Sequence, residues 1–450
     1  MTQSAVSDLT TGSIAKKLYR FALPIIITNL LQAVYSLVDM IIVGRFVVPS
    51  GMVAVSIGGQ ITMIVFCIVS ALANAESALA GQLLGNKNTK GINELVHTML
   101  SFTMIISVII IAVIIIFCNP ILHALQVPED AFAQTRQYLI IYILGTFFVY
   151  IYNVLYGMLR GAGVSLAPMI FAAVSTAVNL VVDYILVKIA GMDVAGAALA
   201  TILSQFLSMV MIIVYIRKKQ LFFHLAPRLL QIRKQWLAPL LKIGLPQVLQ
   251  FTLTSFSFVL ISSLVNSFGT YSAAATGAVD RIYNIAVLPS QAMMAALITF
   301  TAQNLPGKDY KRIWKGIFWG ALLAVIIAGA CLVICETVPG NVLGFFTSNT
   351  DVIEIGARYL RIFAILFVVE AVMFTFYGAL TGAGHTHITF SCAIITAFVI
   401  RCIFSWVLCR GTDLGFYGIA VAYVLAPCAG TLISGLYLAS GRWKKPRVKI

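Results

Sequence analysis

The octapeptide YGMLRGAG at residues 156–163 returns as YGALTGAG at residues 377–384, 221 positions later in a chain of 450 residues. Other identical pairs stand at this offset or at one residue more: Gln82 and Gln303, Lys87 and Lys308, Tyr138 and Tyr359, Pro24 and Pro246, and Gly196 and Gly418. Self-similarity that runs through both halves of a chain indicates an internal duplication. We therefore expect one structural unit that occurs twice.

Composition places both copies in a membrane. Hydrophobic residues make up 60% of the chain and charged residues 10%, and apolar stretches of about 20 residues, the length that a helix needs to cross the hydrocarbon, recur throughout. The sequence predicts twelve spans, at 21–43, 54–80, 95–118, 136–158, 167–188, 194–216, 243–266, 274–301, 314–335, 356–380, 387–409 and 415–440. The expected fold is an all-α integral membrane protein with two pseudo-symmetric six-helix lobes, an architecture typical of secondary transporters.

The basic residues predict the orientation and the domain boundaries. If the amino terminus is cytoplasmic, 22 of the 30 Lys and Arg residues fall on the inner side, as the positive-inside rule requires. We therefore expect a multi-pass plasma membrane protein with both termini in the cytoplasm, and the net charge of +15 needs no nucleic acid partner. The predicted parts are an amino-terminal lobe at 1–216, a basic linker at 217–242 that meets lipid headgroups, and a carboxy-terminal lobe at 243–450.

Ionisable side chains inside membrane spans are costly and are candidates for function. Five acids qualify: Asp39, Glu76, Asp183, Asp280 and Glu370. Asp39 shares a face of the first span with other polar residues, because helix positions three, four and seven apart line up. These neighbours are Gln32, Tyr35 and Ser36, and a second polar stripe on the sixth span comprises Thr201, Ser204, Gln205 and Ser208.

The fifth span contributes a carboxylate and an amide together, because Asp183 follows Asn179 by one helical turn. Counting residues from the ends of the spans puts Asp39, Asp183 and Thr201 at a similar depth. Three helices of one lobe thus bring carboxylates, an amide and a hydroxyl to a common level, as a small cation site requires.

The second copy of the unit is a natural control for this cluster. At the offsets of the repeat, Ile261 replaces Asp39, Ile400 replaces Asn179 and Phe404 replaces Asp183. Because only one copy has the cluster, ion binding is expected in the amino-terminal lobe alone.

These residues resemble those of a known family. Over essentially its full length the chain is similar to multidrug and toxic compound extrusion (MATE) transporters, with Pro24 and the stretch VDMIIVG at 38–44 on the first span. The residues that resemble the cation site of the DinF-like branch are Asp39, Asn179, Asp183 and Thr201. The NorM-like branch has acids on its seventh and tenth spans; Glu370 resembles the second of these, but the seventh span here carries no acid.

The resemblance implies a secondary active exporter of cationic amphipathic small molecules, driven by H⁺ or Na⁺ that enters from outside. No cofactor is expected beyond the coupling ion, and a monomer is sufficient. Neutralising the cluster would change hydrogen bonds among the first, fifth and sixth helices. The first helix could then bend at Pro24, which has no backbone N–H to donate.

Several residues and functions stay open. Candidate polar residues of a substrate cavity are Gln32, Tyr35, Ser36, Gln205, Asp280 and Glu370, whereas Glu76 and Asp280 are also consistent with structural pairing. A lipid-linked oligosaccharide flippase of the same superfamily would share the architecture, although basic cavity residues would then be expected. An intramembrane aspartyl protease could use Asp39 and Asp183, but the chain has no GxGD motif around either acid and no HExxH motif or nucleotide-binding loop. We therefore expect no enzyme, and the eight cysteines form no CxxC pair that would indicate zinc.

Overall fold

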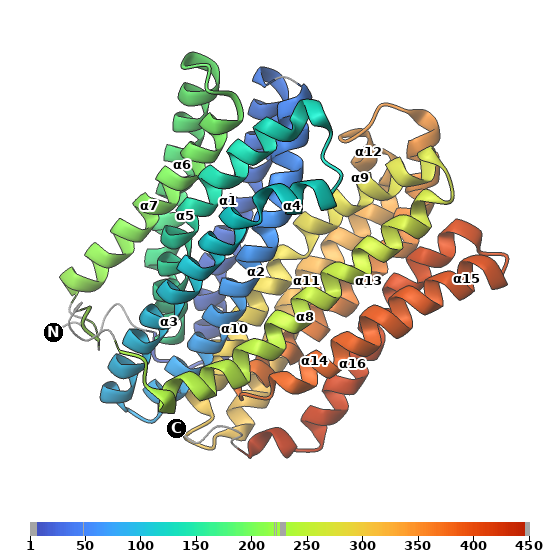
Figure 1. Ribbon diagram of the computed structural model, residues 1–450. Coiled ribbons are helices and arrows are strands. Elements are labelled where there is room, and N and C mark those ends of the chain that lie inside the picture. Colours follow the sequence, from blue (N-terminus) through green and yellow to red (C-terminus); the bar gives the residue numbers. More distant parts are fainter. Residues whose placement is uncertain (1–6, 48, 220, 222, 226–230, 446–450) are drawn as a thin grey trace. The chain divides into compact units, whose positions relative to one another are not determined.

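The computed structural model describes residues 7–47, 49–219, 221, 223–225 and 231–445. Every element assigned in these residues is helical, and twelve helical segments are long and apolar enough to cross a membrane. The predicted all-α fold with twelve spans is thus confirmed for the described part of the chain (Figure 1). One span is interrupted: α9 (Thr270–Ala286) ends just before α10 (Leu288–Asn304), because Pro289 cannot donate to a carbonyl of the preceding turn.

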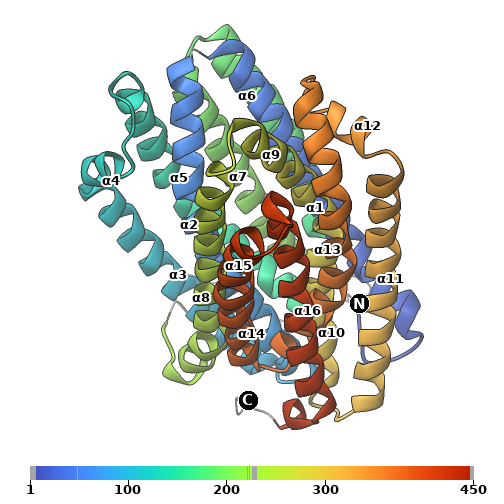
Figure 2. The same ribbon diagram turned by 90° about the vertical axis from the view of Figure 1, so that its right-hand side faces the viewer.

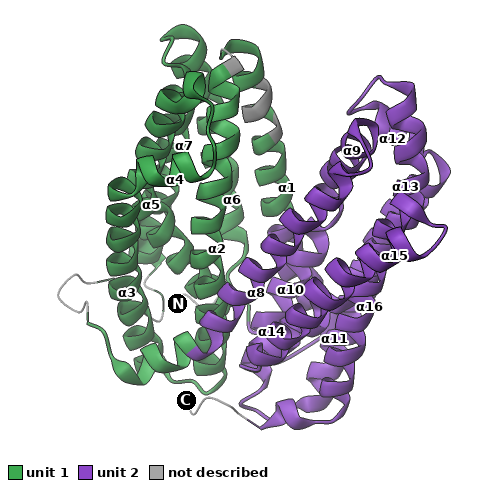
Figure 3. Ribbon diagram, turned by 45° about the vertical axis from the view of Figure 1, so that its right-hand side comes forward, with its two compact units in different colours: residues 1–7, 27–241 green, residues 8–26, 242–450 purple. Residues whose placement is uncertain are grey.

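The helices form two compact units (Figure 3). Unit 1 comprises residues 1–7 and 27–241, and unit 2 comprises residues 8–26 and 242–450. The sequence-based division assigned 8–26 to the amino-terminal lobe, whereas these residues pack within unit 2. The long helix α1 (Ile14–Phe46) therefore begins in unit 2 and continues in unit 1 after Ile26, two residues beyond Pro24.

The segment before α1 is held in unit 2 by polar side chains at the end of α10 and the start of α11 (Tyr310–Thr337). The guanidinium of Arg312 donates to the backbone carbonyls of Leu9, Thr11 and Gly12. The side-chain oxygen of Gln303 accepts from the Leu9 N–H at 3.1 Å, and the Leu9 side chain is fully buried. Charge-assisted bonds of this kind are stronger than neutral ones, which explains why this segment clusters with unit 2.

Unit 1 is organised around α5 (Glu129–Gly161), which packs against four other helices. The remaining helices of this unit are α2 (Pro49–Gly85), α3 (Thr89–Ile116), α4 (Cys118–Ala124), α6 (Leu166–Asp183), the π-helix η2 (Tyr184–Ile189) and α7 (Asp193–Lys219). The core includes Leu139 and Tyr150 of α5 with Val69 of α2. The buried Tyr150 hydroxyl donates to the Val65 carbonyl at 2.8 Å, so its polar group is satisfied inside the core.

Unit 2 is organised in the same way around α13 (Thr350–Gly382), which packs against α9, α10, α11 and α16 (Figure 2). The remaining helices are α8 (Lys234–Asn266) from residue 242 onward, α11 (Tyr310–Thr337), α12 (Pro339–Gly344), α14 (Thr386–Ile394), the π-helix η4 (Ile395–Phe404), α15 (Ser405–Gly411), the 3-10 turns η5 (Gly415–Tyr417) and η6 (Arg442–Lys444), and α16 (Gly418–Ala439). Its core is strongly aromatic, since Phe363 of α13 contacts the rings of Tyr283, Tyr359 and Tyr423.

The duplication is visible in local detail. Both ends of α13 lie 221 positions after those of α5, and α11 is related to α3 in the same way. Lys87 and Lys308 both adopt positive φ, at 55° and 54°. Each is followed by a helix cap, Asn88 or Asp309, whose side chain accepts a backbone N–H of the first turn.

The glycines of the repeated octapeptide allow two helices to approach closely. The distances from an added Cβ to the facing carbonyl oxygen would be 2.7 Å for Gly157 and Ala73, 2.6 Å for Gly161 and Ser77, 2.5 Å for Gly378 and Met294, and 2.4 Å for Gly382 and Ile298. These pairs place α5 on α2 in unit 1 and α13 on α10 in unit 2, the small-xxx-small packing of membrane helices. The final glycines, Gly163 and Gly384, have φ of 84° and 82° and make the turn that follows, which a side chain would strain.

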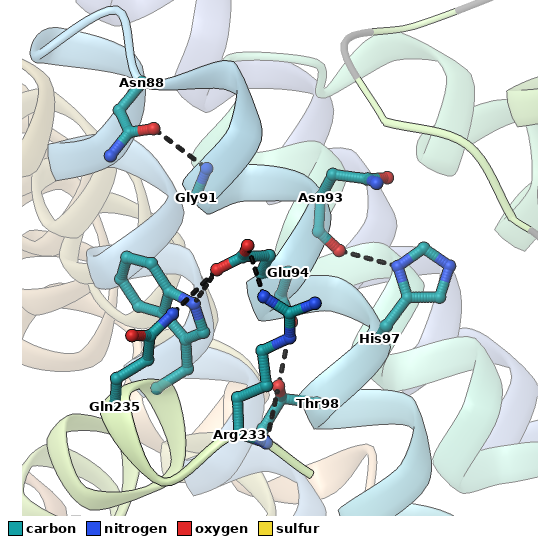
Figure 4. A network of polar contacts seen from close by, with 9 residues as sticks. Asn88, Gly91, Asn93, Glu94, His97, Thr98, Arg233 and Gln235 are labelled. Carbon is teal, nitrogen blue, oxygen red and sulfur yellow. Dashed lines mark hydrogen bonds and ion pairs between the residues drawn. The ribbon is translucent and has the colours of Figure 1, made fainter. Parts of the chain in front are cut away.

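Glu94, near the start of α3, attaches the end of the linker to unit 1 (Figure 4). Its carboxylate accepts from Arg233, from Gln235 Nε2 at 2.7 Å and from Trp236 Nε1 at 2.9 Å. The Arg233 backbone N–H also donates to Thr98 Oγ1 at 3.3 Å. The Arg233 side chain is 45% exposed, so solvent weakens the ion pair and the two neutral donors contribute a large share of the attachment.

Replacing Glu94 by Ala removes all three side-chain bonds of this attachment. We expect trypsin to cleave the native protein after Arg233 severalfold faster in Glu94→Ala than in the wild type, because local opening precedes proteolysis. Limited digestion followed by mass spectrometry measures this rate. The matched change at the exposed Glu354, Glu354→Ala, is expected to leave the rate unchanged, and equal rates in both variants would contradict the role of Glu94.

Candidate functional site

The fifth span of unit 1 presents a buried polar stripe. Ser175, Asn179 and Asp183 follow one another at intervals of four on α6, and all three are buried, with Asp183 fully so. The Ser175 hydroxyl donates to the Ser204 carbonyl of α7 at 2.6 Å, so the stripe faces α7. The Asn179 Oδ1 atom is buried and has no hydrogen-bond partner among the described residues, an acceptor that a cation or a bound proton could satisfy.

The sixth span places Thr201 beside this stripe. The close approach of Gly196 to Leu186, together with the Ser175–Ser204 bond, fixes the register of α6 and η2 against the antiparallel α7. In that register Asn179 lies opposite the turn that contains Thr201. The hydroxyl of Thr201 also shares a hydrogen bond of 3.0 Å with the Tyr35 hydroxyl of α1. The structure thus joins Tyr35 of the first span to Thr201 of the sixth, and Ser175 of the fifth span to Ser204 of the sixth; the four-residue cation site stays a prediction.

Other candidate residues have different surroundings. Asp39 lies within α1, but its side chain is outside the described residues. Gln32 and Ser36 are exposed on α1, and Ser36 donates to the Gln32 carbonyl at 3.0 Å. Gln205 of α7 is half-buried, and Pro24 is buried in unit 2.

The chemistry of this site suits a small hard cation or a proton. An amide, a hydroxyl and a carboxylate supply oxygen ligands, which such cations prefer, while a carboxylate alone is sufficient to carry a proton. Within the part of the chain that the structure describes, no group of three or more His, Cys, Asp or Glu side chains could hold a metal ion. A transition-metal centre therefore has no support among those residues.

In unit 2, the residues that correspond to Asn179 and Asp183 differ from those that the sequence analysis paired with them. Gly418 approaches Leu408 as Gly196 approaches Leu186, so the offset here is 222, and counting back along the helix pairs Asn179 with Arg401. Asp183 then pairs with Ser405; the pairing with Ile400 and Phe404 was shifted by one residue. The π-helix of this span has 10 residues in unit 2 and 6 in unit 1, and the wider π turn accommodates the additional residue.

The acids predicted in the second half both lie in unit 2. Glu370 is 4% exposed and accepts hydrogen bonds from the Tyr283 hydroxyl at 3.0 and 3.3 Å. Arg401, 6% exposed, interacts with it electrostatically. Asp280 is half-buried on α9 and interacts electrostatically with Tyr359 and Tyr423. The tenth-span acid thus has a basic neighbour within its own unit, which the sequence pattern did not reveal.

A further buried acid lies where α2 and α5 pack together. Glu76 is fully buried, and neither carboxylate oxygen has a hydrogen-bond partner among the described residues. Its electrostatic partner is Arg160 of the octapeptide, whose guanidinium bonds Asn74 at 2.7 Å and Ser77 at 3.4 Å. The helix-pairing role expected for Glu76 agrees with this arrangement.

Removing Arg160 would leave the buried Glu76 carboxylate uncompensated. We expect Arg160→Met to reduce the free energy of unfolding by about 1–3 kcal/mol, because Asn74 loses its charged donor and Glu76 its electrostatic partner. The double variant Arg160→Met/Glu76→Gln should be more stable than the single one, because no charge remains buried. The unfolding midpoint in detergent measures the difference, and a double variant less stable than Arg160→Met would refute the pairing.

Comparison with known proteins agrees with the duplicated fold. The MatE family model matches the chain twice, at residues 24–185 and 246–407. The probable multidrug resistance protein YpnP of Bacillus subtilis is 28% identical, with 97% of each chain covered. The multidrug export protein MepA of Staphylococcus aureus is 24% identical, with 95% of this chain and 94% of MepA covered.

Solved structures show the same fold at low identity. An outward-facing multidrug resistance MATE transporter aligns with a TM-score of 0.91 at 20% identity, over 98% of this chain and 99% of that one. A Pyrococcus furiosus transporter of the MOP superfamily, described as having a binding pocket of reversed polarity, aligns with a TM-score of 0.92 at 21% identity, over 99% and 100%. Because the two family matches together cover most of the chain, each over one copy of the repeat, this protein belongs to the MATE family.

Proposed function

We propose that this chain is a secondary active multidrug efflux transporter that exports cationic amphipathic compounds in antiport with H⁺ or Na⁺. Membership of a transporter family and the names of the relatives support export of small molecules. The observation that carries the coupling mechanism is the buried stripe of Asn179 and Asp183 on α6, packed against the α7 turn of Thr201. A buried carboxylate beside an unsatisfied amide oxygen in a membrane helix marks an ion pathway.

The proposed cycle begins when H⁺ or Na⁺ reaches Asp183, together with Asp39, from outside. Neutralising the acid removes a buried charge, and the contacts of α6 with α1 and α7 rearrange. Pro24 supports a bend in α1, since the missing backbone donor lies within one turn of the point at which the helix passes from unit 2 to unit 1. The bend would release the drug to the outside.

The two acids also bear on the energetics. Exchange of one cation for one singly charged drug moves no net charge, so only the chemical gradient drives it, at about 1.4 kcal/mol for each pH unit. A second ion, carried by the second acid, would add about 2.3 kcal/mol for each 100 mV of membrane potential. One-for-one exchange sustains a drug gradient of about tenfold per pH unit, and two ions per drug would sustain more.

We place the transporter in the plasma membrane as a monomer with both termini in the cytoplasm. The basic residues of the linker and of the chain ends support this orientation, since they would lie at the inner leaflet. Besides the drug and the coupling ion, the mechanism needs only the lipid bilayer as a partner.

The test is dye movement in proteoliposomes with the two gradients imposed separately. Purified protein is reconstituted, and uptake of a fluorescent cationic dye is followed after a pH jump, after a sodium jump and with neither. We expect one gradient to drive dye movement, which identifies the ion, and protein-free liposomes give the leak. Folded protein that moves no cationic dye under either gradient would refute the antiport and favour a flippase.

A further inference from the structure

The place in unit 2 that corresponds to the candidate cation site of unit 1 contains a guanidinium group. At the offset of 222 that applies here, Tyr35 corresponds to Ser257, Asn179 to Arg401, Asp183 to Ser405 and Thr201 to Tyr423. In unit 1 Tyr35 and Thr201 are joined by a hydrogen bond. In unit 2 Arg401 contacts the equivalents of both.

Arg401 contacts three side chains of unit 2. Its Nη1 atom donates to the Ser257 hydroxyl at 3.0 Å, and its guanidinium lies 5.1 Å from the ring centre of Tyr423 and 4.6 Å from that of Phe258. Cation–π contacts of this kind gain strength where water is excluded, and Arg401 is 6% exposed. The Arg401 Nε atom is buried without a hydrogen-bond partner among the residues that the structure describes, so the aromatic rings and nearby charge supply much of its compensation.

The negative partner comes from the central helix of the unit. Glu370 of α13 interacts electrostatically with Arg401, and the Tyr283 hydroxyl between α9 and α13 bonds to the carboxylate. Other titratable groups that interact electrostatically with Arg401 are Tyr377, Cys402 and Tyr423. A lone buried carboxylate would require an ion or a proton, and here the chain itself supplies the positive charge.

We propose that Arg401 is a tethered cation that permanently occupies the ion-site position of unit 2 and balances Glu370, so that this unit exchanges no coupling ion. One consequence of this proposal rests on the proposed antiport function: only unit 1 would respond to the coupling ion. It explains how unit 2 can hold a buried acid on α13, where unit 1 has Val149 on α5, while it lacks the acid and amide of the fifth span. Arg401 is thus a residue that determines where in the duplicated fold the ion can bind.

The test measures whether unit 2 responds to ions in a variant from which the ion-binding acids expected in unit 1 have been removed. In Asp39→Asn/Asp183→Asn, the unfolding midpoint is measured in sodium chloride and in choline chloride at equal ionic strength, each in mildly acidic and mildly alkaline buffer. We expect little dependence on sodium or pH in this background. Adding Arg401→Gln should make the unfolding midpoint depend on sodium and pH. Acid or sodium should raise it by several degrees, because Glu370 then lacks its counter-ion.

Two further variants separate charge balance from packing. Arg401→Lys keeps the positive charge and should restore the insensitive behaviour, while Arg401→Gln/Glu370→Gln should abolish the new dependence. If Arg401→Gln alone does not fold, recovery of folded protein by Glu370→Gln supports the proposal, and failure to recover overturns it. A folded Arg401→Gln variant that is as insensitive as the background also overturns it.

The outcomes distinguish this inference from the antiport function. Loss of ion dependence on replacing Asp39 and Asp183 tests unit 1, whereas the response to Arg401→Gln depends on residues of unit 2 alone. Wild-type protein that moves no dye, combined with a sodium-sensitive or pH-sensitive Arg401→Gln variant, would refute the antiport and leave the tethered cation standing.

Discussion

Asp183→Asn should reduce gradient-driven efflux at least about tenfold, the effect of losing a typical coupling free energy. The side chain is fully buried at the end of α6, and Asn has nearly the same shape but can neither take up a proton nor offer a negative charge to Na⁺. Dye binding at equilibrium, measured by fluorescence anisotropy, should change little, because the residue acts on the driving ion. Transport is measured in proteoliposomes under the gradient that drives the wild type.

The matched control is Asp130→Asn, the same chemical change at an exposed acid on α5 of the same unit. This variant should transport at the wild-type rate. Asp183→Asn should also unfold at the same temperature as the wild type or higher, since a buried carboxylate is costly to desolvate. Wild-type efflux by a folded Asp183→Asn variant would remove Asp183 from the coupling mechanism.

The fold was largely predictable because membrane spans follow from length and apolarity alone. The repeat of the octapeptide also predicted two related units. The structure explains why these residues recur, since Gly157 and Gly378 occupy the same kind of helix contact. Membership of residues 8–26 in unit 2 could not be predicted, because it depends on the bonds of Arg312 to backbone carbonyls, which leave no sequence pattern.

Part of the candidate site was predictable, because helical periodicity can be read from the sequence. Helical periodicity placed Asn179 and Asp183 on one face, and the burial of both agrees with that expectation. The environment of Arg401 was missed, because a π-helix shifts the repeat by one residue and a constant offset of 221 pairs Asn179 with Ile400 instead. The change in offset from 221 at the octapeptide to 222 at Gly196 and Gly418 was the signal in the sequence that indicates this shift.

Gly378→Ala should destabilise unit 2 by about 1–3 kcal/mol, the usual cost of adding a methyl group to a closely packed contact. The new Cβ would stand 2.5 Å from the Met294 carbonyl oxygen and 3.0 Å from the Leu297 Cβ. These atoms belong to helix α10, and a backbone oxygen cannot rotate away as a long side chain can. The two helices would have to separate along the central contact of the unit, and the unfolding midpoint in detergent should fall.

The same substitution at Gly329 of α11 separates packing from helix propensity. An added Cβ there has no atom within 4 Å, and Ala is favoured over Gly in a helix by up to about 1 kcal/mol. Gly329→Ala should therefore leave the midpoint unchanged or raise it, so only Gly378→Ala should lower it. An equal or higher midpoint for Gly378→Ala would mean that α10 and α13 do not approach as closely as the octapeptide requires, and the packing explanation of the repeat would fail with it.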